Sequence, residues 1–442
     1  MLRFLTMALL ISGVYLPGLA SFATAQNSPA APTVNVSSGA VHMRLGAGTV
    51  IIPESSQANV SDAGIRAHTN FEVFVPQGLT PDEAPPFPGY AFETPASLAC
   101  IYRLVTAVSG CNPNTVTANA SGGSKAIAIV DAYDDPWAGP DLAYFSDQFG
   151  LPFSPSQLTV VYANGTQPSM DNTGEWELEE STDIEYVHAM APNAHIFLVE
   201  AASNSISDLL SAVVVANNEV LCGQANCPSG GSGAGEVSMS WGTDEFPAET
   251  SLDSYFRSKG IVYFAATGDT PGTAWPSTSP NVVAAGGTTT ARGPSSGNLL
   301  YEITWTDAGG GLSPYEGRPA YQNSISYLVG SQRGVPDLSL DSNPDTGVWV
   351  WDSNYFDQLG GGWFIVGGTS VATQALAGIV NSAGHFNASS SAELTTIYAN
   401  RSKGADFRDI TTGFCGPYSG DNASAGWDVC TGVGSDIGLT GK

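Results

Sequence analysis

The sequence predicts an α/β fold with a mostly parallel central sheet and helices on both faces. The chain has 442 residues, of which 42% are hydrophobic, so it can bury a sizeable core. From Lys125 onward, short apolar runs rich in β-branched residues alternate with longer helical stretches. Continuous apolar strands separated by helices are typical of a parallel sheet that is covered on both sides.

The expected elements follow from the length and pattern of each run. Short apolar runs predict strands at residues 126–132, 158–163, 195–201, 237–240, 261–266 and 282–285. Longer stretches predict helices at residues 140–149, 177–190, 205–218, 252–258 and 371–383. In such sheets, functional sites gather at the carboxyl ends of the strands. Residues 288–362 are rich in glycine and aromatic side chains and are too long for one simple loop.

Residues 1–25 have the pattern of a secretory signal peptide. Arg3 precedes a mostly apolar stretch, and Ala23-Thr24-Ala25 offers a cleavage site made of small residues. We therefore expect a secreted protein, extracellular or periplasmic, whose mature chain does not cross a membrane. Residues 26–122 are rich in Pro, Ser and Gly and indicate an irregular N-terminal extension, with a short helix expected within residues 94–105.

Acidic residues dominate a chain that carries few charges in total. Lys and Arg number 14, Asp and Glu number 41, and the formal net charge is −27. This balance repels nucleic acid and anionic lipid, so neither is an expected partner. It suits a protein that works in acid, because carboxylates protonate there and their mutual repulsion fades. A halophile-like or simply acidic secreted protein would have the same composition.

The chain has six cysteines, and an even number of cysteines in an exported protein favours disulfides. They form sequence-local pairs, Cys100 with Cys111, Cys222 with Cys227, and Cys415 with Cys430. This local pairing is the simplest of the connectivities that the count allows.

Ser370 is a candidate nucleophile. It follows Gly367-Gly368-Thr369, directly before the expected helix at residues 371–383. A hydroxyl at a helix N-terminus lies where negative charge is stabilised, which suits an attack that creates an oxyanion. The alternative is that Ser370 only caps the helix.

Carboxyl groups provide the other candidates. Glu179 and Asp183 are four residues apart on the expected helix at residues 177–190, so their side chains share one face. Like charges at this spacing destabilise a helix and raise at least one pKa, which favours a functional pair; a solvated acidic face is the alternative. Asp269 follows the expected strand at residues 261–266, where it can point into a cleft or form an Asx-turn.

The motifs Glu179-x-x-x-Asp183, Thr267-Gly268-Asp269 and Gly367-Gly368-Thr369-Ser370, in this order, resemble the signatures of the sedolisin family, the serine-carboxyl peptidases related to subtilisin. The resemblance covers about residues 125–442, with further matching stretches at 190–194, 240–242, 275–277, 286–288, 309–313, 333–337 and 426–428. It implies a subtilisin-like fold, a peptidase domain over residues 123–442 and serine endopeptidase activity in acid. The implied roles are Ser370 as nucleophile, Glu179 as general base, Asp183 as its hydrogen-bonded partner and Asp269 as the oxyanion-hole residue.

The chemistry of these residues fits work in acid. A histidine with a pKa near ~6.5 is protonated in acid and cannot act as a base, whereas a glutamate near ~4.3 stays partly ionised. Glu179 can then accept the Ser370 proton and return it to the leaving amine. Asp269 can donate a hydrogen bond to an oxyanion only as the neutral acid. We therefore expect an acidic pH optimum.

A second constellation lies near the C-terminal end, where Asp409-Ile410-Thr411 and Gly426-Trp427-Asp428 bracket a Gly-rich loop. Two carboxylates with several backbone carbonyls suit Ca²⁺, which takes six to eight oxygen ligands. The pattern resembles the single structural calcium site of sedolisins. The implied ligands are the side chains of Asp409 and Asp428 and the carbonyls of Ile410, Ser424 and Gly426. The family usually has Gly where Ser424 stands, and a disulfide-bound turn without metal is the alternative.

Two features depart from the family pattern. Gln374 stands where the helix of the nucleophile usually has Pro, and glutamine is tolerated at that position. Residues 26–122 give much less room than the large folded propeptide with which sedolisins are commonly made. They form either a shortened propeptide or a retained extension held by Cys100 and Cys111; we expect retention, without automatic self-processing.

Two other function classes stay open. An ordinary subtilisin-type peptidase with a neutral optimum would use Asp131 as the triad acid, with His188 as the nearest candidate for its base. A catalytically inactive, sedolisin-like binding protein is the other class. For the leading interpretation we expect a peptide or protein substrate and a monomeric protein.

Overall fold

The computed structural model describes residues 40–442 except 46–47, 79–91, 107, 223–231, 355 and 357–358. The predicted signal peptide and Cys227 lie outside the described residues. Within the described part, no helix has the length and apolar character that crossing a membrane requires.

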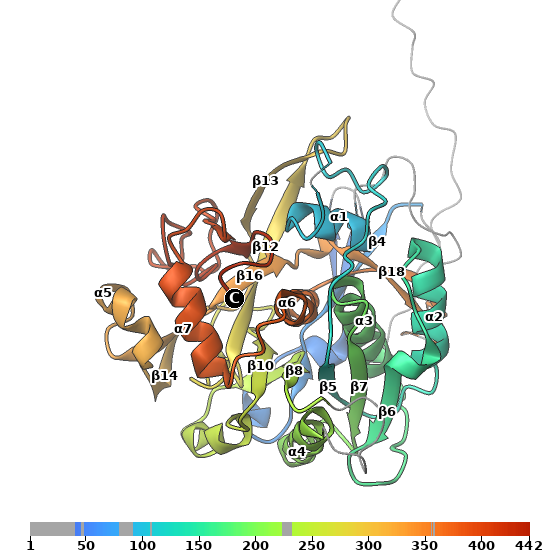
Figure 1. Ribbon diagram of the computed structural model, residues 1–442, viewed down its shortest axis with the longest axis horizontal. Coiled ribbons are helices and arrows are strands. Elements are labelled where there is room, and N and C mark those ends of the chain that lie inside the picture. Colours follow the sequence, from blue (N-terminus) through green and yellow to red (C-terminus); the bar gives the residue numbers. More distant parts are fainter. Residues whose placement is uncertain are drawn as a thin grey trace, which may run out of the picture. The chain divides into compact units, whose positions relative to one another are not determined.

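A mostly parallel sheet runs through the centre of the molecule (Figure 1). Its strand order is β13-β12-β10-β8-β5-β7-β6, with β16 also paired to β12. The strands are β5 (Ala126–Ala132), β6 (Leu158–Tyr162), β7 (His195–Ala201), β8 (Gly235–Met239), β10 (Ile261–Ala266), β12 (Val283–Arg292), β13 (Leu299–Thr304) and β16 (Leu338–Asp341). Only the β12–β13 pair in this sheet, among the described strands, is antiparallel. The predicted fold class is confirmed.

Helices cover both faces of this sheet. The α-helices of the described part are α1 (Pro95–Ile101), α2 (Ala138–Phe149), α3 (Glu175–Met190), α4 (Ile206–Leu221), α5 (Ser326–Val329), α6 (Thr369–Ala383) and α7 (Ser390–Asn400). Side chains of β7 alternate between the faces: Ile196 and Leu198 pack with α2 and α3, whereas Phe197 and Val199 pack with α4. This two-sided burial explains why the strands read as continuous apolar runs.

The two helices that carry the candidate residues, α3 and α6, pack directly against each other. Gly378 makes the close approach possible, because a Cβ at this position would lie 2.7 Å from the Cβ of Met190. Any larger residue would push the helices apart. The spacing of the two helices therefore depends on one glycine.

One expected helix is absent from the described structure. Residues 252–258 form no α-helix; short 3₁₀ turns at Glu249–Ser251 and Asp253–Phe256 replace it. The Glu249 carboxylate accepts a hydrogen bond from the backbone N–H of Phe246, at 2.8 Å, and Asp253 accepts one from the hydroxyl of Ser279, at 2.6 Å. The Glu249 bond is local, and acidic side chains that bond locally in this way compete with helix formation, whereas the Asp253 bond is a long-range contact.

The described part of the N-terminal region is more regular than expected. It contributes β1 (Val41–Leu45), β2 (Gly48–Ile52) and β4 (Glu72–Pro76) to an antiparallel sheet with β18 (Gly362–Gly367) and β17 (Val348–Asp352), in the order β1-β2-β4-β18-β17. Helix α1 falls where a short helix was expected. The expectation of irregular chain is therefore wrong for these segments, while the predicted domain boundaries stay predictions.

Two of the predicted disulfides are confirmed. Cys100 bonds to Cys111, and Cys415 bonds to Cys430. The third predicted pair includes Cys227, so it falls outside the described residues. The first bridge joins the end of α1 to the following loop, and the second closes the C-terminal loop.

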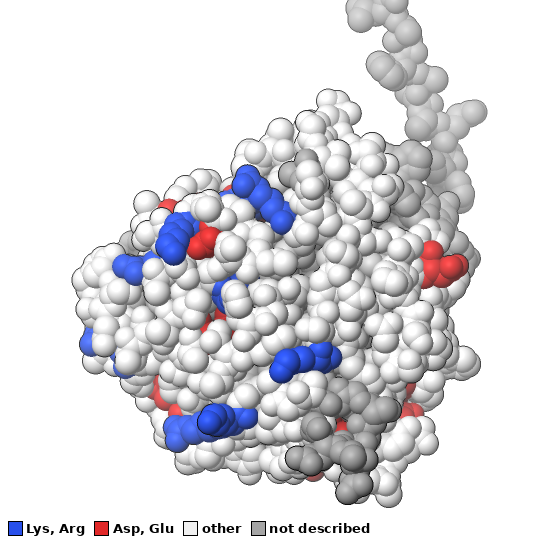
Figure 2. Space-filling view, in the orientation of Figure 1, with Lys and Arg blue, Asp and Glu red and all other residues white. Residues whose placement is uncertain are grey.

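Many acidic side chains are buried, so the formal charge overstates the charge of the surface. Examples are Asp131, Asp135, Glu180, Glu200 and Glu236. Burial raises the pKa of Asp135 to about 7, of Glu236 to about 8 and of Glu200 to about 9, so these groups are neutral in acid. Figure 2 shows a face on which most side chains are neither acidic nor basic.

Candidate active site

Ser370 lies at the N-terminus of α6, in the turn that follows β18. Gly368 has a φ of +117°, and a Cβ there would lie 2.1 Å from the backbone oxygen of Asn70, so only glycine fits this turn. The Ser370 hydroxyl donates a hydrogen bond to the carbonyl of Ser240, at 3.2 Å. Its exposed fraction is 0%, so the candidate nucleophile is fully covered.

Glu179 and Asp183 face this turn from α3, and both are fully buried. Burial raises the pKa of Glu179 well above its usual value, and the nearby Asp131 carboxyl adds to this. The hydroxyls of Ser370 and Ser240 lie near enough to favour its charged form. Neither Glu179 oxygen accepts a hydrogen bond from the described residues, because Ser370 is turned toward the Ser240 carbonyl instead.

Asp131, at the end of β5, extends this pair to a group of three carboxyls. Burial raises the pKa of Asp131 to about 7, while its contact with Asp183 acts in the opposite direction. Burial also raises the pKa of Asp183 well above its usual value, followed by the charges of Asp131 and Glu179. No ion pair within the described part of the chain involves these carboxyls. The group must therefore share protons, since three uncompensated charges cannot persist together.

Gln374 connects α6 to these carboxyls. Its side-chain Nε2 donates to Oδ2 of Asp183 and to the hydroxyl of Ser240, the latter at 2.8 Å. Gln374 is therefore more than a tolerated replacement for proline, because its amide binds the acid that neighbours Glu179. Sequence reasoning missed this role, although a polar amide one turn after the nucleophile was the available signal.

Asp269 follows β10 and binds the first residue of α6. Its Oδ1 accepts hydrogen bonds from the backbone N–H and the hydroxyl of Thr369, both at 2.8 Å. Its Oδ2 has no partner among the described residues. Burial raises the pKa of Asp269 to about 7, and the bonds from Thr369 oppose this only in part. In acid, Asp269 is therefore a neutral group with one O–H free to donate next to Ser370.

A segment of the same chain passes over Ser370. Strand β3 (His68–Thr69) pairs antiparallel with β9 (Trp241–Asp244), with His68 opposite Gly242. The carbonyl of Asn70 accepts a hydrogen bond from the backbone N–H of Ser370, at 3.1 Å. The Asn70 side chain donates to the carbonyl of Ser240, at 2.7 Å. The sequence carries no motif that would have indicated Asn70.

Among the histidines whose side chains the structure describes, none is placed to replace Glu179 as the base. Burial lowers the pKa of His188 to about 4, and its ring packs against Phe153. His188 is nine residues from Glu179 on α3, or roughly 13 Å along the helix axis. Among the described residues, no hydrogen bond joins a histidine to Ser370 or Asp131.

Hydrogen bonds join four of the five candidate calcium-ligand residues in two pairs. Asp409 accepts hydrogen bonds from the backbone N–H of Gly426, at 3.0 and 3.2 Å, and Asp428 accepts one from Ser424, at 2.8 Å. Neither carboxylate forms an ion pair with the described cationic residues. No cluster of three or more His, Cys, Asp or Glu side chains suited to a metal occurs in the described part. The predicted set has only two carboxylates, and its oxygen-only chemistry fits Ca²⁺.

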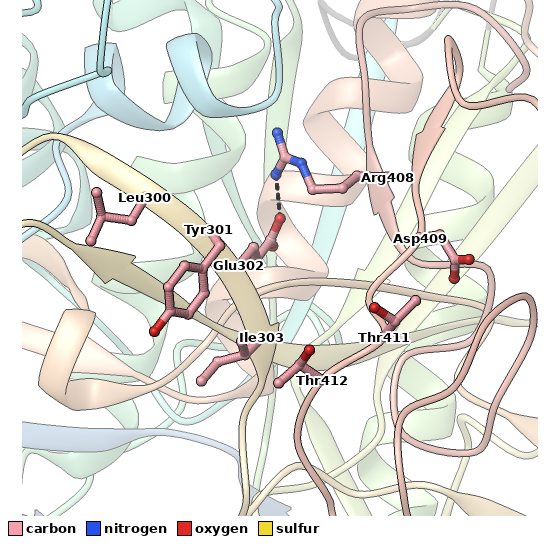
Figure 3. A pocket seen from close by; sticks show the side chains of 8 residues that line it. All are labelled: Leu300, Tyr301, Glu302, Ile303, Arg408, Asp409, Thr411 and Thr412. Carbon is pink, nitrogen blue, oxygen red and sulfur yellow. Dashed lines mark hydrogen bonds and ion pairs between the residues drawn. The ribbon is translucent and has the colours of Figure 1, made fainter.

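A hollow of about 580 Å³ lies between β13 and the segment that contains Arg408 and Thr412. Figure 3 shows Leu300, Tyr301 and Ile303 along it, with Arg408 paired to Glu302. None of its lining residues is a catalytic candidate. The hollow therefore does not mark the active site. At Ser370 the space is taken up by the segment around Asn70 that passes over it.

This α/β architecture, with a serine at a helix N-terminus facing buried carboxyls, is a subtilisin-like fold. The chain is 30% identical to kumamolisin from a Bacillus species over 363 residues, 72% of this chain and 59% of kumamolisin. It is 25% identical to sedolisin from a Pseudomonas species over 333 residues, 67% of this chain and 53% of that relative. The chain therefore spans less than two thirds of these relatives' own lengths.

A solved structure of Pseudomonas sedolisin, described as a serine-carboxyl proteinase complexed with two molecules of pseudo-iodotyrostatin, matches with a TM-score of 0.61. The match has 22% identity and covers 78% of this chain and 95% of that one. No family model matches the chain. The relatives support the sedolisin family for this chain, with a subtilisin-like fold.

Proposed function

We propose that this chain is a secreted serine-carboxyl endopeptidase that hydrolyses peptide bonds in acid. The observation that carries the proposal is the meeting of the Ser370 hydroxyl, Glu179 and the neutral Asp269 at the N-terminus of α6. A peptide or protein is the substrate that this chemistry fits. Nucleic acid and membrane are not expected partners, and we expect a monomer.

In the proposed mechanism, the Ser370 hydroxyl turns from the Ser240 carbonyl toward Glu179, which accepts its proton as the oxygen attacks the substrate carbonyl. Asp183 shares the charge that Glu179 would otherwise hold alone. The oxyanion lies between the backbone N–H of Ser370 and the O–H of Asp269, which donates only while Asp269 is protonated. Glu179 then returns the proton to the leaving amine.

The pH dependence follows from the two protonation states that this mechanism needs. Activity requires a negative charge on Glu179 and a proton on Asp269. Burial and the neighbouring Asp131 raise the pKa of Glu179, so the acidic limit lies above that of a free glutamate. The pKa of Asp269, about 7, sets the alkaline limit. The expected optimum is therefore mildly acidic.

Calcium has a structural part in the proposal. The side chains of Asp409 and Asp428, with the carbonyls of Ile410, Ser424 and Gly426, would hold one Ca²⁺. The ion would fix the loop that Cys415 and Cys430 close. It supplies no catalytic chemistry there.

The test is a pH–rate profile on a denatured protein substrate, with Ser370→Ala beside the wild type. We expect a maximum in mild acid for the wild type and no turnover for Ser370→Ala, with both proteins folded by circular dichroism. A maximum near pH ~8 would favour the neutral subtilisin-type alternative. Equal and negligible rates for the two folded proteins at every pH would favour the inactive binding protein.

A further inference from the structure

Helix α2 turns a stripe of aromatic and apolar side chains toward the solvent. Its core-facing side is made of residues such as Leu142 and Phe145, which are fully buried. The opposite side begins at Trp137, directly before the helix, and continues with Pro140 and Tyr144, all three exposed. Positions three and seven apart share one side of a helix, and the solvent side of a surface helix is normally polar. This aromatic stripe, Trp137, Pro140 and Tyr144, is therefore not explained by packing.

A second aromatic layer supports the stripe from below. The Tyr144 ring lies 4.2 Å from the ring of Trp351 in β17 and 6.0 Å from that of Trp363 in β18, measured between centroids. Trp351 donates from Nε1 to the carboxyl of Asp141, at 3.1 Å, which ties this layer to the buried side of α2. Tyr144 nevertheless stays 46% exposed. A ring that is already held in place loses little conformational entropy when its exposed side binds a partner.

The elements around the stripe carry no positive charge. The chain has no Lys or Arg between residues 126 and 256, nor between residues 334 and 400. These two ranges contain α2 and the elements that pack against it, including α3 and β17. Figure 2 shows basic side chains at the left and centre of the view but none among the coloured residues at the right, where Figure 1 places α2. A cationic partner would therefore meet no repulsion from neighbouring side chains on these elements.

Asp147 adds a negative charge at the end of the stripe. It is exposed and lies three residues after Tyr144, so the two side chains are neighbours on the helix surface. It also stands in the last turn of α2, which contains no basic residue. The C-terminal end of a helix dipole is negative and disfavours an acid there. No ion pair in the described part of the chain involves Asp147. A bound cation would relieve this unfavourable placement.

We propose that the aromatic stripe and Asp147 form a docking surface for a basic segment of a polypeptide. Lysine or arginine side chains of the partner lie over the rings of Trp137 and Tyr144, which attract cations through their faces. The two rings are roughly 10 Å apart along the helix axis, so an extended peptide can reach both. Asp147 supplies the direct charge contact. Charge complementarity selects this partner over an acidic peptide, for which α2 offers no positive group. Docking requires no catalytic step, so it stands apart from the proposed function.

The experiment measures the binding of a rhodamine-labelled oligolysine by fluorescence anisotropy. The full-length protein carries Ser370→Ala, so that the probe is not consumed, and the pH is about 6, where exposed carboxylates are ionised. We expect the added pair Trp137→Ala and Tyr144→Ala to raise the Kd about tenfold. Asp147→Lys should raise the Kd at least about threefold although it favours the helix end and should not lower the Tm. A Kd that is unchanged in either variant would overturn the proposal.

Matched variants separate docking on α2 from general attraction to an acidic protein. Tyr327→Ala removes a ring that is 80% exposed on α5, and Asp345→Lys reverses the charge of another exposed acid; both should keep the parent Kd. Trp137→Phe with Tyr144→Phe retains both rings and should bind within about twofold of the parent. Equal losses in the controls and the α2 variants would overturn the proposal. Tighter binding of oligoglutamate or of a neutral chitin oligosaccharide, lost in the double alanine variant, would overturn it in favour of another partner.

Discussion

Replacing Asp269 by asparagine is expected to remove the alkaline limit of activity rather than the activity itself. The pKa of Asp269 is about 7, because burial outweighs the two hydrogen bonds from Thr369. At pH 5 about 99% of this carboxyl carries its proton, and at pH 8 only about 10% does. Above pH 7 the wild-type rate should therefore fall about tenfold per pH unit.

An asparagine at position 269 can accept the Thr369 bonds through Oδ1 and donate from Nδ2 at every pH. We expect Asp269→Asn to keep measurable activity in acid and to lose the decline that begins near pH 7. Asp269→Ala has no donor and should lose ~3–4 kcal/mol of transition-state stabilisation, or ~10²–10³ in kcat. The measurement is kcat/KM against pH for the three proteins. An unchanged alkaline limit in Asp269→Asn would refute the role given to Asp269.

Three further predictions concern other groups. Gln374→Leu removes the amide that donates to Asp183, so Asp183 should hold its proton more firmly and repel the Glu179 charge less, and the acidic limit of the pH–rate profile should move down by up to about one unit. Calcium removal with EDTA should lower the Tm of the wild type but not that of Asp428→Asn; an equal drop in both would refute the proposed site. The Tm of Glu236→Gln should fall less between pH 5 and pH 7 than the Tm of the wild type. The reason is that the pKa of Glu236 in the folded protein, about 8, lies above its value in the unfolded chain. The stability that the protonated Glu236 contributes is fully present below about pH 4.5 and is lost as pH rises toward 8. By pH 7 the loss in the free energy of unfolding is up to about 3 kcal/mol. Exposed Glu54→Gln is its control, and an equal effect of both variants would contradict this reasoning.

Much of the central sheet could be predicted from the sequence because strands such as β5, β7 and β10 are apolar on both sides, whereas β16, in which two of four residues are polar, was not predicted. The runs predicted as strands at residues 126–132, 195–201 and 261–266 are β5, β7 and β10, with the same bounds. Strand β4 was missed because it pairs with β18, which lies almost three hundred residues further along the chain, and β2 was missed with it because β2 pairs with β4. Local sequence carries little information about such distant partners.

The candidate site shows the same division. Ser370, Asp269, Glu179 and Asp183 each lie in a short motif, and the structure brings them together. The hydrogen bonds of Asn70 to Ser370 and Ser240 depend on the pairing of β3 with β9, which no local sequence pattern predicts. From the sequence, Asp131 was considered only as the acid of a subtilisin-type triad. Its contact with Asp183 could not be predicted, because that contact arises from the packing of α3 on β5.

The buried acids also change how the protein exchanges protons with its solvent. At neutral pH the native chain retains protons on groups such as Glu200 and Glu236, which a denatured chain would give up. Denaturation there should acidify a weakly buffered solution, and its calorimetric enthalpy should vary with the ionisation heat of the buffer. For the same reason, the native protein should elute from an anion exchanger earlier than its amino-acid composition suggests.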